Sequence, residues 1–133
     1  MKFLLDTHTF VWSIAEPKKL PRSLLNILQN PDVEIFVSAI SLWEISIKER
    51  LGKLTLVGIT TEDLIPSAKK MGFQLIALKP EEAATQGQLA ENTHFDPFDR
   101  MLIWQAISRK LTLVSSDTQF RRFASDGLKV LWQ

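Results

Sequence analysis

The sequence predicts an α/β domain in which a parallel β-sheet is covered by helices on both faces. Short runs of β-branched and large apolar residues alternate with longer segments of helical periodicity. The nearly continuous apolar character of the short runs is typical of strands that are buried on both faces. With 133 residues, 45% of them apolar and 23% charged, the chain is expected to form a single domain over residues 1–133.

Five segments are expected to be strands, and longer amphipathic segments are expected to connect them as helices. The predicted strands are 2–5, 34–38, 73–78, 112–115 and 128–132. The predicted helical segments are 7–30, 39–51, 61–71, 80–90 and 97–110, followed by a short turn at 118–123. Pro17 is expected to divide the first of these into two helices. Gly52 and Gly72 follow predicted helices at the position of a C-terminal cap.

The composition excludes several classes of protein. The chain has no cysteine, which excludes a disulfide-stabilised scaffold, a thiolate zinc site and a cysteine nucleophile. No segment approaches the ~20 apolar residues of a membrane span, and the apolar start ends at Asp6, too early for a signal peptide. A soluble, cytoplasmic protein with no membrane partner is expected.

Two aspartates follow predicted strands. Asp6 comes directly after the first strand and Asp117 closely follows the fourth. Ligands of open α/β sheets bind at the carboxyl ends of the strands, above all where the strand order reverses. If these strands are neighbours, the two carboxylates face each other, although an aspartate after a strand is also a common helix N-cap.

Glu44 lies on a predicted helix at a position where an apolar residue is expected. At 100° per residue, Ile40, Trp43, Ile47 and Leu51 form an apolar stripe, and Glu44 falls inside it. A carboxylate buried there must be paired, protonated or bound to a cation. Pairing with a Lys or Arg of another segment is the structural alternative.

Asp99 is a second acid of this kind. The predicted buried face of its helix is formed by Leu102, Ile103, Ala106 and Ile107. Asp99 lies on this same face, one turn closer to the start of the helix. The nearby Asp96 precedes Pro97 and is expected to be the N-cap of this helix.

Convergence of these acids would require a counter-ion. Two like charges ~4 Å apart repel by about 4 kcal/mol at an effective dielectric of ~20. Hard oxygen ligands favour Mg²⁺ or Mn²⁺ over zinc or copper. Such an ion offers a Lewis acid and an activated water for the hydrolysis of a phosphodiester bond. Thr7, Ser115 and Ser116 flank the acids, where they are expected to cap helices or strand ends, with a hydrogen bond to a metal-bound water as the alternative.

The charge distribution suits a phosphate backbone. If Asp6, Glu44, Asp96, Asp99 and Asp117 share one cleft, ten acidic residues remain against sixteen basic ones. Candidate contacts to RNA phosphates are Lys48, Arg50, Lys53, Arg100, Arg121 and Arg122, with a solvated surface charge as the alternative for each.

Four segments carry a resemblance to a known family. They are LLDTH at 4–8, SLWEISIK at 41–48 with GKL at 52–54, HFDPFDRMLI at 94–103, and LVSSD at 113–117. The sequence resembles PIN-domain proteins and, among them, the VapC toxins of toxin–antitoxin modules, over residues 2–132. In this family the matching positions of Asp6, Glu44, Asp99 and Asp117 bind the metal.

The resemblance implies a three-layer α/β/α sandwich with a five-stranded parallel sheet. It also implies an endoribonuclease that depends on Mg²⁺ or Mn²⁺, a homodimer, and neutralisation by a small VapB-like antitoxin at the acidic cleft. Phe95 departs from the family, in which a basic residue is often present between the histidine and the Asp-Pro pair. If that residue contacts RNA, its absence here is expected to weaken or redirect RNA binding. The alternative functions are a non-catalytic PIN-like module that binds protein or RNA, and a phosphatase or receiver-like domain. A receiver is disfavoured because Asp6 has no adjacent acid and Lys129 lies within the last predicted strand.

Overall fold

The computed structural model describes residues 1–93 and 96–133, and these contain a five-stranded sheet in which each adjacent pair of strands is parallel. The strands are β1 (Lys2–Leu5), β2 (Glu34–Ser38), β3 (Gln74–Ile76), β4 (Thr112–Val114) and β5 (Val130–Leu131). Their spatial order is β3-β2-β1-β4-β5. The expected neighbours β1 and β4 are therefore paired, with Leu4 opposite Leu113.

The helices follow the expected order along the chain. The α-helices are α1 (Thr7–Ala15), α2 (Arg22–Gln29), α3 (Ala39–Arg50), α4 (Leu64–Lys70), α5 (Pro80–Thr85) and α6 (Pro97–Ser108). The 3-10 segments are η1 (Pro17–Lys19), η2 (Gln86–Gln88) and η3 (Thr118–Asp126). The break at Pro17 is confirmed. Gly52 and Gly72, with φ of 73° and 84°, adopt the left-handed conformation that a glycine C-cap requires.

The differences from the prediction lie at the ends of elements. The first two strands have the predicted bounds, and β4 ends one residue earlier than predicted, at Val114. β3 and β5 are shorter as well, because each is an edge strand and pairs along one side only. The predicted helix 80–90 ends at Thr85 and continues as η2, which contains the poor helix former Gly87. The predicted turn at 118–123 is longer, since η3 extends to Asp126.

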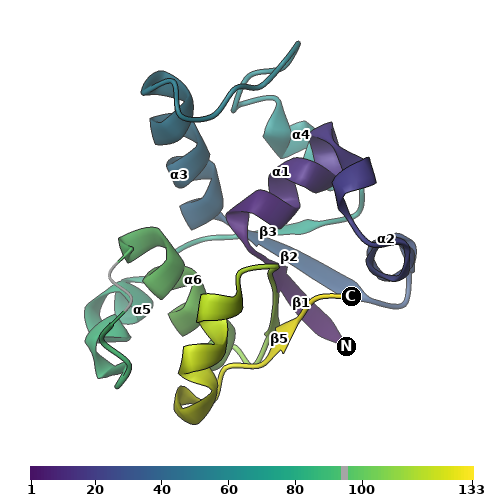
Figure 1. The fold of residues 1–133 in the computed structure, drawn as a ribbon. Coiled ribbons are helices and arrows are strands. Elements are labelled where there is room, and N and C mark those ends of the chain that lie inside the picture. Colours follow the sequence, from purple (N-terminus) through teal and green to yellow (C-terminus); the bar gives the residue numbers. More distant parts are fainter. Residues whose placement is uncertain (94–95) are drawn as a thin grey trace.

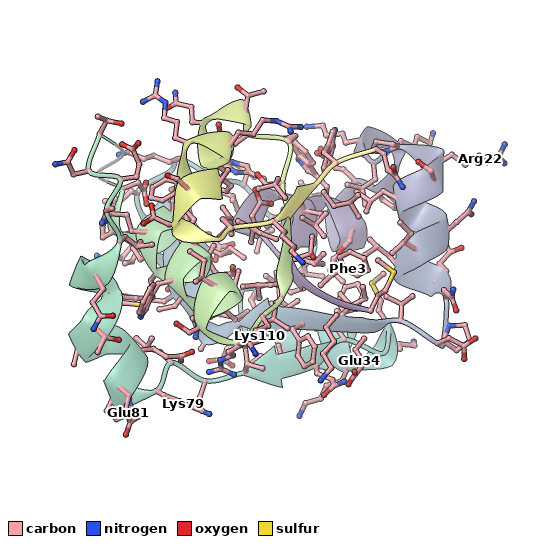
Figure 2. All side chains as sticks on the ribbon, turned by 90° about the horizontal axis from the view of Figure 1, so that it is seen from below. Phe3, Arg22, Glu34, Lys79, Glu81 and Lys110 are labelled. Carbon is pink, nitrogen blue, oxygen red and sulfur yellow. The ribbon has the colours of Figure 1, made fainter. Side chains whose placement is uncertain are left out.

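Two hydrophobic clusters on opposite faces of the sheet make the three layers (Figure 1). Phe3 and Leu5 of β1 belong to the cluster that includes residues of α1, α2 and α4. Leu4, which points the other way because strand side chains alternate, belongs to the cluster with α6 and η3. Figure 2 shows the result at the level of side chains, with Phe3 inside and charged residues such as Arg22 and Glu81 projecting at the periphery.

Polar contacts fix α3 and α6 relative to each other at the carboxyl edge of the sheet. The Ser38 hydroxyl, at the end of β2, accepts from the Ile40 N–H at 3.1 Å and so caps α3. The same hydroxyl donates to Gln105 of α6 at 2.6 Å. Both residues are fully buried, so this contact sets the distance between the helices that carry Glu44 and Asp99.

At the C-terminal end of α6, the C-cap residue Arg109 donates to the carboxylate of Glu82 from Nε at 2.7 Å and from a terminal nitrogen at 2.8 Å. Gln105 also donates to Glu82, at 3.2 Å, and the Lys79 N–H donates to it at 2.9 Å. These bonds attach α5 to the later turns of α6.

Of the helices in the described part of the chain, none is long and apolar enough for a membrane span.

Candidate active site at the carboxyl edge of the sheet

Asp6 lies where β1 passes into α1, and its side chain has a structural role. Its carboxylate accepts from the Thr9 N–H at 2.9 Å and caps α1, so the N-cap alternative describes a real contact. Its own N–H donates to the Val114 carbonyl at 3.0 Å, which extends the pairing of β1 with β4. Asp6 is 5% exposed. Burial raises the pKa of its carboxyl, although hydrogen bonds from Ser115 and Thr9 act in the opposite direction.

Ser115 lies near both Asp6 and Asp117. Its hydroxyl accepts from the Asp117 N–H at 3.0 Å, and its influence on the Asp6 carboxyl lowers the pKa of that group against the effect of burial. Asp117 is exposed and caps η3 by accepting from the Gln119 N–H at 2.9 Å. The strand order reverses between β1 and β4, so these aspartates flank the switch point of the sheet. Ser116, between them in sequence, is exposed.

Glu44 faces the interior from α3, and both of its carboxylate oxygens have partners. It is 2% exposed. Its Oε1 is 2.6 Å from the Thr7 hydroxyl, which donates to it. Its Oε2 accepts from the ammonium of Lys48, one turn further along α3. The Thr7 hydroxyl is also 3.1 Å from Ser41 Oγ. A basic partner for Glu44 therefore exists, as in the structural alternative, but it comes from the same helix and not from another segment.

Asp96 and Asp99 occupy the start of α6. Asp96 is the N-cap, as predicted, and accepts from the N–H groups of Phe98 at 2.9 Å and Asp99 at 3.0 Å. Asp99 lies in the first turn and is half-buried. Both carboxylates act electrostatically on Lys48. Burial lowers the pKa of Lys48, but the hydrogen bond to Glu44 and the charges of Glu44, Asp96 and Asp99 outweigh burial and raise it.

The predicted site residues form two groups at this edge. Asp6 and Asp117 follow the paired strands β1 and β4. Glu44 binds Lys48, whose ammonium is also attracted by the charges of Asp96 and Asp99. Thr7, the neighbour of Asp6, links the groups by its bond to Glu44. Within residues 1–93 and 96–133, no three acidic or histidine side chains are gathered tightly enough to hold a metal ion.

The predicted apolar stripe of α3 is correct at Ile40, which is 3% exposed, and wrong at Trp43 and Leu51, which are each 57% exposed. Ser41, Glu44 and Ile45 are buried instead. The polar groups of Ser41 and Glu44 can be buried there because Thr7 and Lys48 are their partners. Trp43 instead contacts Phe98 edge-to-face, with ring centroids 5.1 Å apart. Glu44 is buried, as predicted. The apolar stripe from which its burial was inferred, however, is only partly the buried face of the helix.

Sequence reasoning assigned Lys48 to RNA and missed its contact with Glu44. The signal was present, since residues four apart on a helix are neighbours and a Glu-to-Lys pair in that order is favourable. Ser41 was missed as well, and nothing in its sequence context distinguishes it from an ordinary helix residue. On α6, Leu102, Ile103 and Ala106 are buried as predicted.

The other proposed phosphate contacts surround this edge. Arg50 lies beside Trp43 in a shallow groove at the end of α3. Arg100 donates to the Glu91 carbonyl at 2.7 Å and lies over the Phe123 ring. Arg121 is exposed on η3. Contact with RNA stays a prediction for each of them. The departure at Phe95 lies outside the described residues.

Comparisons with known proteins agree with this architecture. The family model of the PIN domain matches residues 3–126. Ribonuclease VapC22 of Mycobacterium tuberculosis is 29% identical over 129 residues, which is 97% of both chains.

Two solved structures have the same fold. One is VapBC2 from Rickettsia felis bound to a promoter DNA fragment, with a TM-score of 0.76, 18% identity and complete coverage of both chains. The other is DNA-bound VapBC from Salmonella typhimurium, with a TM-score of 0.69, 21% identity and coverage of 98% of this chain and 97% of that one. With the α/β/α layers, the strand order and the family match over nearly its whole length, this chain belongs to the PIN domain family.

Proposed function

We propose that this chain is a divalent-metal-dependent endoribonuclease and the toxin of a type II toxin–antitoxin pair. The observation that carries the proposal is the placement of Asp6 and Asp117 directly after the paired strands β1 and β4, at the switch point of the sheet. Ligands of open α/β sheets bind at this point. The similarity to a ribonuclease over 97% of both chains supports the choice of RNA as the substrate.

The donor set fits Mg²⁺ or Mn²⁺. Asp6, Glu44, Asp99 and Asp117 would hold the ion, since carboxylate oxygens are the ligands that these hard cations prefer. Asp6 and Glu44 are also buried, and buried carboxylates call for a compensating positive charge. A bound ion would supply a Lewis acid for the phosphoryl oxygens and lower the pKa of the attacking water.

The chain's own residues would orient these carboxylates. The Thr9 N–H holds Asp6, and the Thr7 hydroxyl holds Glu44. Asp96 supports the start of α6 and, through it, Asp99. Arg50, Arg100 and Arg121 would contact RNA phosphates, which positions a substrate without reading its sequence.

The partners follow from the comparisons by analogy. The structures from Rickettsia felis and Salmonella typhimurium are VapBC complexes, which supports a VapB-like antitoxin as the partner of this chain. A homodimer is part of the same proposal. Co-expression of this chain with the VapB-like protein from its own genome, followed by size-exclusion chromatography with light scattering, would test both.

The decisive experiment is cleavage of a mixed RNA pool in the presence of Mn²⁺, Mg²⁺ or a chelator. An identically purified Asp99→Asn protein reveals any contaminating ribonuclease, because the substitution removes one charge and is nearly isosteric. Cleavage by the unmodified protein with metal, and none by Asp99→Asn, is the expected result. Equal cleavage by both proteins, or none by either in the presence of metal, would contradict the proposed activity and favour a non-catalytic binding module.

A further inference from the structure

Lys48 occupies a position that a bound divalent ion would also need. Its ammonium donates to Glu44 Oε2, while the Thr7 hydroxyl occupies Oε1. Glu44 is 2% exposed, so little water remains to solvate the carboxylate. An ion that approaches Oε2 therefore meets a positive charge already in place.

The backbone explains why Lys48 is held there. Long helical side chains point toward the N-terminus of their helix, which brings residue 48 over residue 44. The end of α3 closes on the same residue, because the Lys48 carbonyl accepts from the N–H of Lys53 at 2.8 Å and of Leu54 at 3.2 Å. This closure passes through Gly52 with a φ of 73°, a left-handed conformation that suits glycine.

Further acids lie near Lys48. Besides the bonded Glu44, the charges of Asp96 and Asp99 at the start of α6 attract its ammonium. The side chain of Lys48 is still 30% exposed. In an ordinary i,i+4 ion pair on a helix surface, the lysine would be near one acid only, here Glu44.

We propose that Lys48 is an internal counter-ion of the acidic site, which holds Glu44 in place in the metal-free protein and competes with the divalent ion for Glu44. This inference rests on the proposed function, because it concerns the affinity of the same site for its metal. Lys48 is a positioning residue in this proposal, and its charge weakens metal binding while its hydrogen bond keeps the carboxylate oriented.

Mn²⁺ binding to the full-length protein tests the proposal directly, by titration calorimetry and by the electron paramagnetic resonance signal of free Mn²⁺. Lys48→Gln removes the charge and keeps a hydrogen-bond donor for Glu44, whereas Lys48→Arg keeps the charge. Lys69→Met, an exposed lysine on α4, controls for the change in net charge. Circular dichroism checks that each variant is folded.

Lys48→Gln is expected to bind Mn²⁺ about tenfold more tightly than the unmodified protein, a difference of about 1.4 kcal/mol. Lys48→Arg and Lys69→Met are expected to stay within threefold of it. In chelator Lys48→Gln is expected to melt at a lower temperature than the unmodified protein, and saturating Mn²⁺ is expected to remove this difference. Should Lys48→Gln fail to fold, Lys48→Met, which preserves the length of the apolar stem, takes its place.

Unchanged or weaker Mn²⁺ affinity of Lys48→Gln would overturn the inference, as would equal tightening in Lys69→Met. Failure of the proposed function looks different, since the unmodified protein would then neither bind Mn²⁺ at Asp99 nor cleave RNA with it. If the unmodified protein binds the ion and cleaves, but Lys48→Gln binds no more tightly, the enzyme proposal survives and the role of Lys48 does not.

Discussion

The hydroxyl of Thr7 lies 2.6 Å from the buried Oε1 of Glu44 and joins the first residue of α1 to the inner face of α3. Helices that are far apart in the sequence are thereby held together at the carboxyl edge of the sheet. Because Thr7 directly follows Asp6, this contact also sets the spacing between two of the acids that we assign to the metal.

Replacement of Thr7 by Val tests this contact. Valine keeps the shape and the β-branch but leaves Glu44 Oε1 buried without its donor, at an expected cost of about 1–3 kcal/mol. Urea denaturation in chelator measures the loss of free energy of unfolding. Thr7→Ser, which retains the hydroxyl, is the matched control and is expected to keep most of the stability. A Thr7→Val protein as stable as Thr7→Ser would mean that the hydroxyl does not support the carboxylate.

Replacement of Asp6 by Asn is expected to separate stability from activity. Burial raises the pKa of Asp6, so its ionised form at neutral pH costs free energy in the metal-free protein. Asparagine keeps an acceptor for the Thr9 N–H and removes the charge. We expect the variant to be more stable in chelator and to lose metal-dependent cleavage.

Urea denaturation in chelator and the RNA assay measure these two effects of Asp6→Asn. A loss of stability would show that the cap needs the full charge of the aspartate. Retained cleavage would remove Asp6 from the proposed metal site.

The ion pair of Glu82 with Arg109 predicts a pH dependence that lies outside the proposed site. The hydrogen bond from Arg109 is the main cause that lowers the pKa of Glu82 from 4.5 to about 2. A carboxyl whose pKa is lowered by folding stabilises the folded state above its ordinary pKa, and this contribution is lost as the pH falls from about 4.5 toward 2. At about 1.4 kcal/mol per pKa unit, the contribution at neutral pH is about 3 kcal/mol.

Glu82→Gln is therefore expected to be less stable than the unmodified protein at pH 7, by a difference that narrows as the pH falls from 5 to 3. Chemical denaturation across this range measures the difference, and Glu81→Gln, an exposed neighbour on α5, is the control. RNA cleavage at neutral pH is expected to persist in folded Glu82→Gln. A difference that stays constant with pH would assign the effect to packing rather than to the charge.

The sequence was most informative where strand ends determine position. Asp6 and Asp117 could be placed at one edge because they follow buried strands, and the pairing of β1 with β4 confirms that these strands are neighbours. Periodicity was a poorer guide on α3, since the apolar face is turned outward at Trp43. The bond of Thr7 to Glu44 could not be predicted, because it depends on which hydroxyl meets which acceptor in three dimensions. The roles of all these acids in metal binding remain predictions.

Stability in the presence of metal gives the most direct physical check of the site. A ligand that binds only the folded state stabilises it by about 2.7 kcal/mol at a hundredfold excess over its dissociation constant. For a domain of this size that corresponds to an increase in Tm of about 10 °C. The described acids are not already gathered around one point, so the ion has to draw them together. Removal of any one of these acids is therefore expected to weaken the binding of the ion.

The melting temperature is therefore expected to rise with Mn²⁺ relative to chelator in the unmodified protein, and to rise far less in Asp99→Asn and Asp117→Asn. Asp32→Asn, an exposed acid before β2 at the opposite edge of the sheet, makes the same change in charge and is expected to keep the full shift. Equal melting temperatures of the unmodified protein in Mn²⁺ and in chelator would contradict a metal site formed by these carboxylates. A shift that survives in Asp99→Asn and Asp117→Asn but is lost in Asp32→Asn would place the bound ion at the other edge of the sheet.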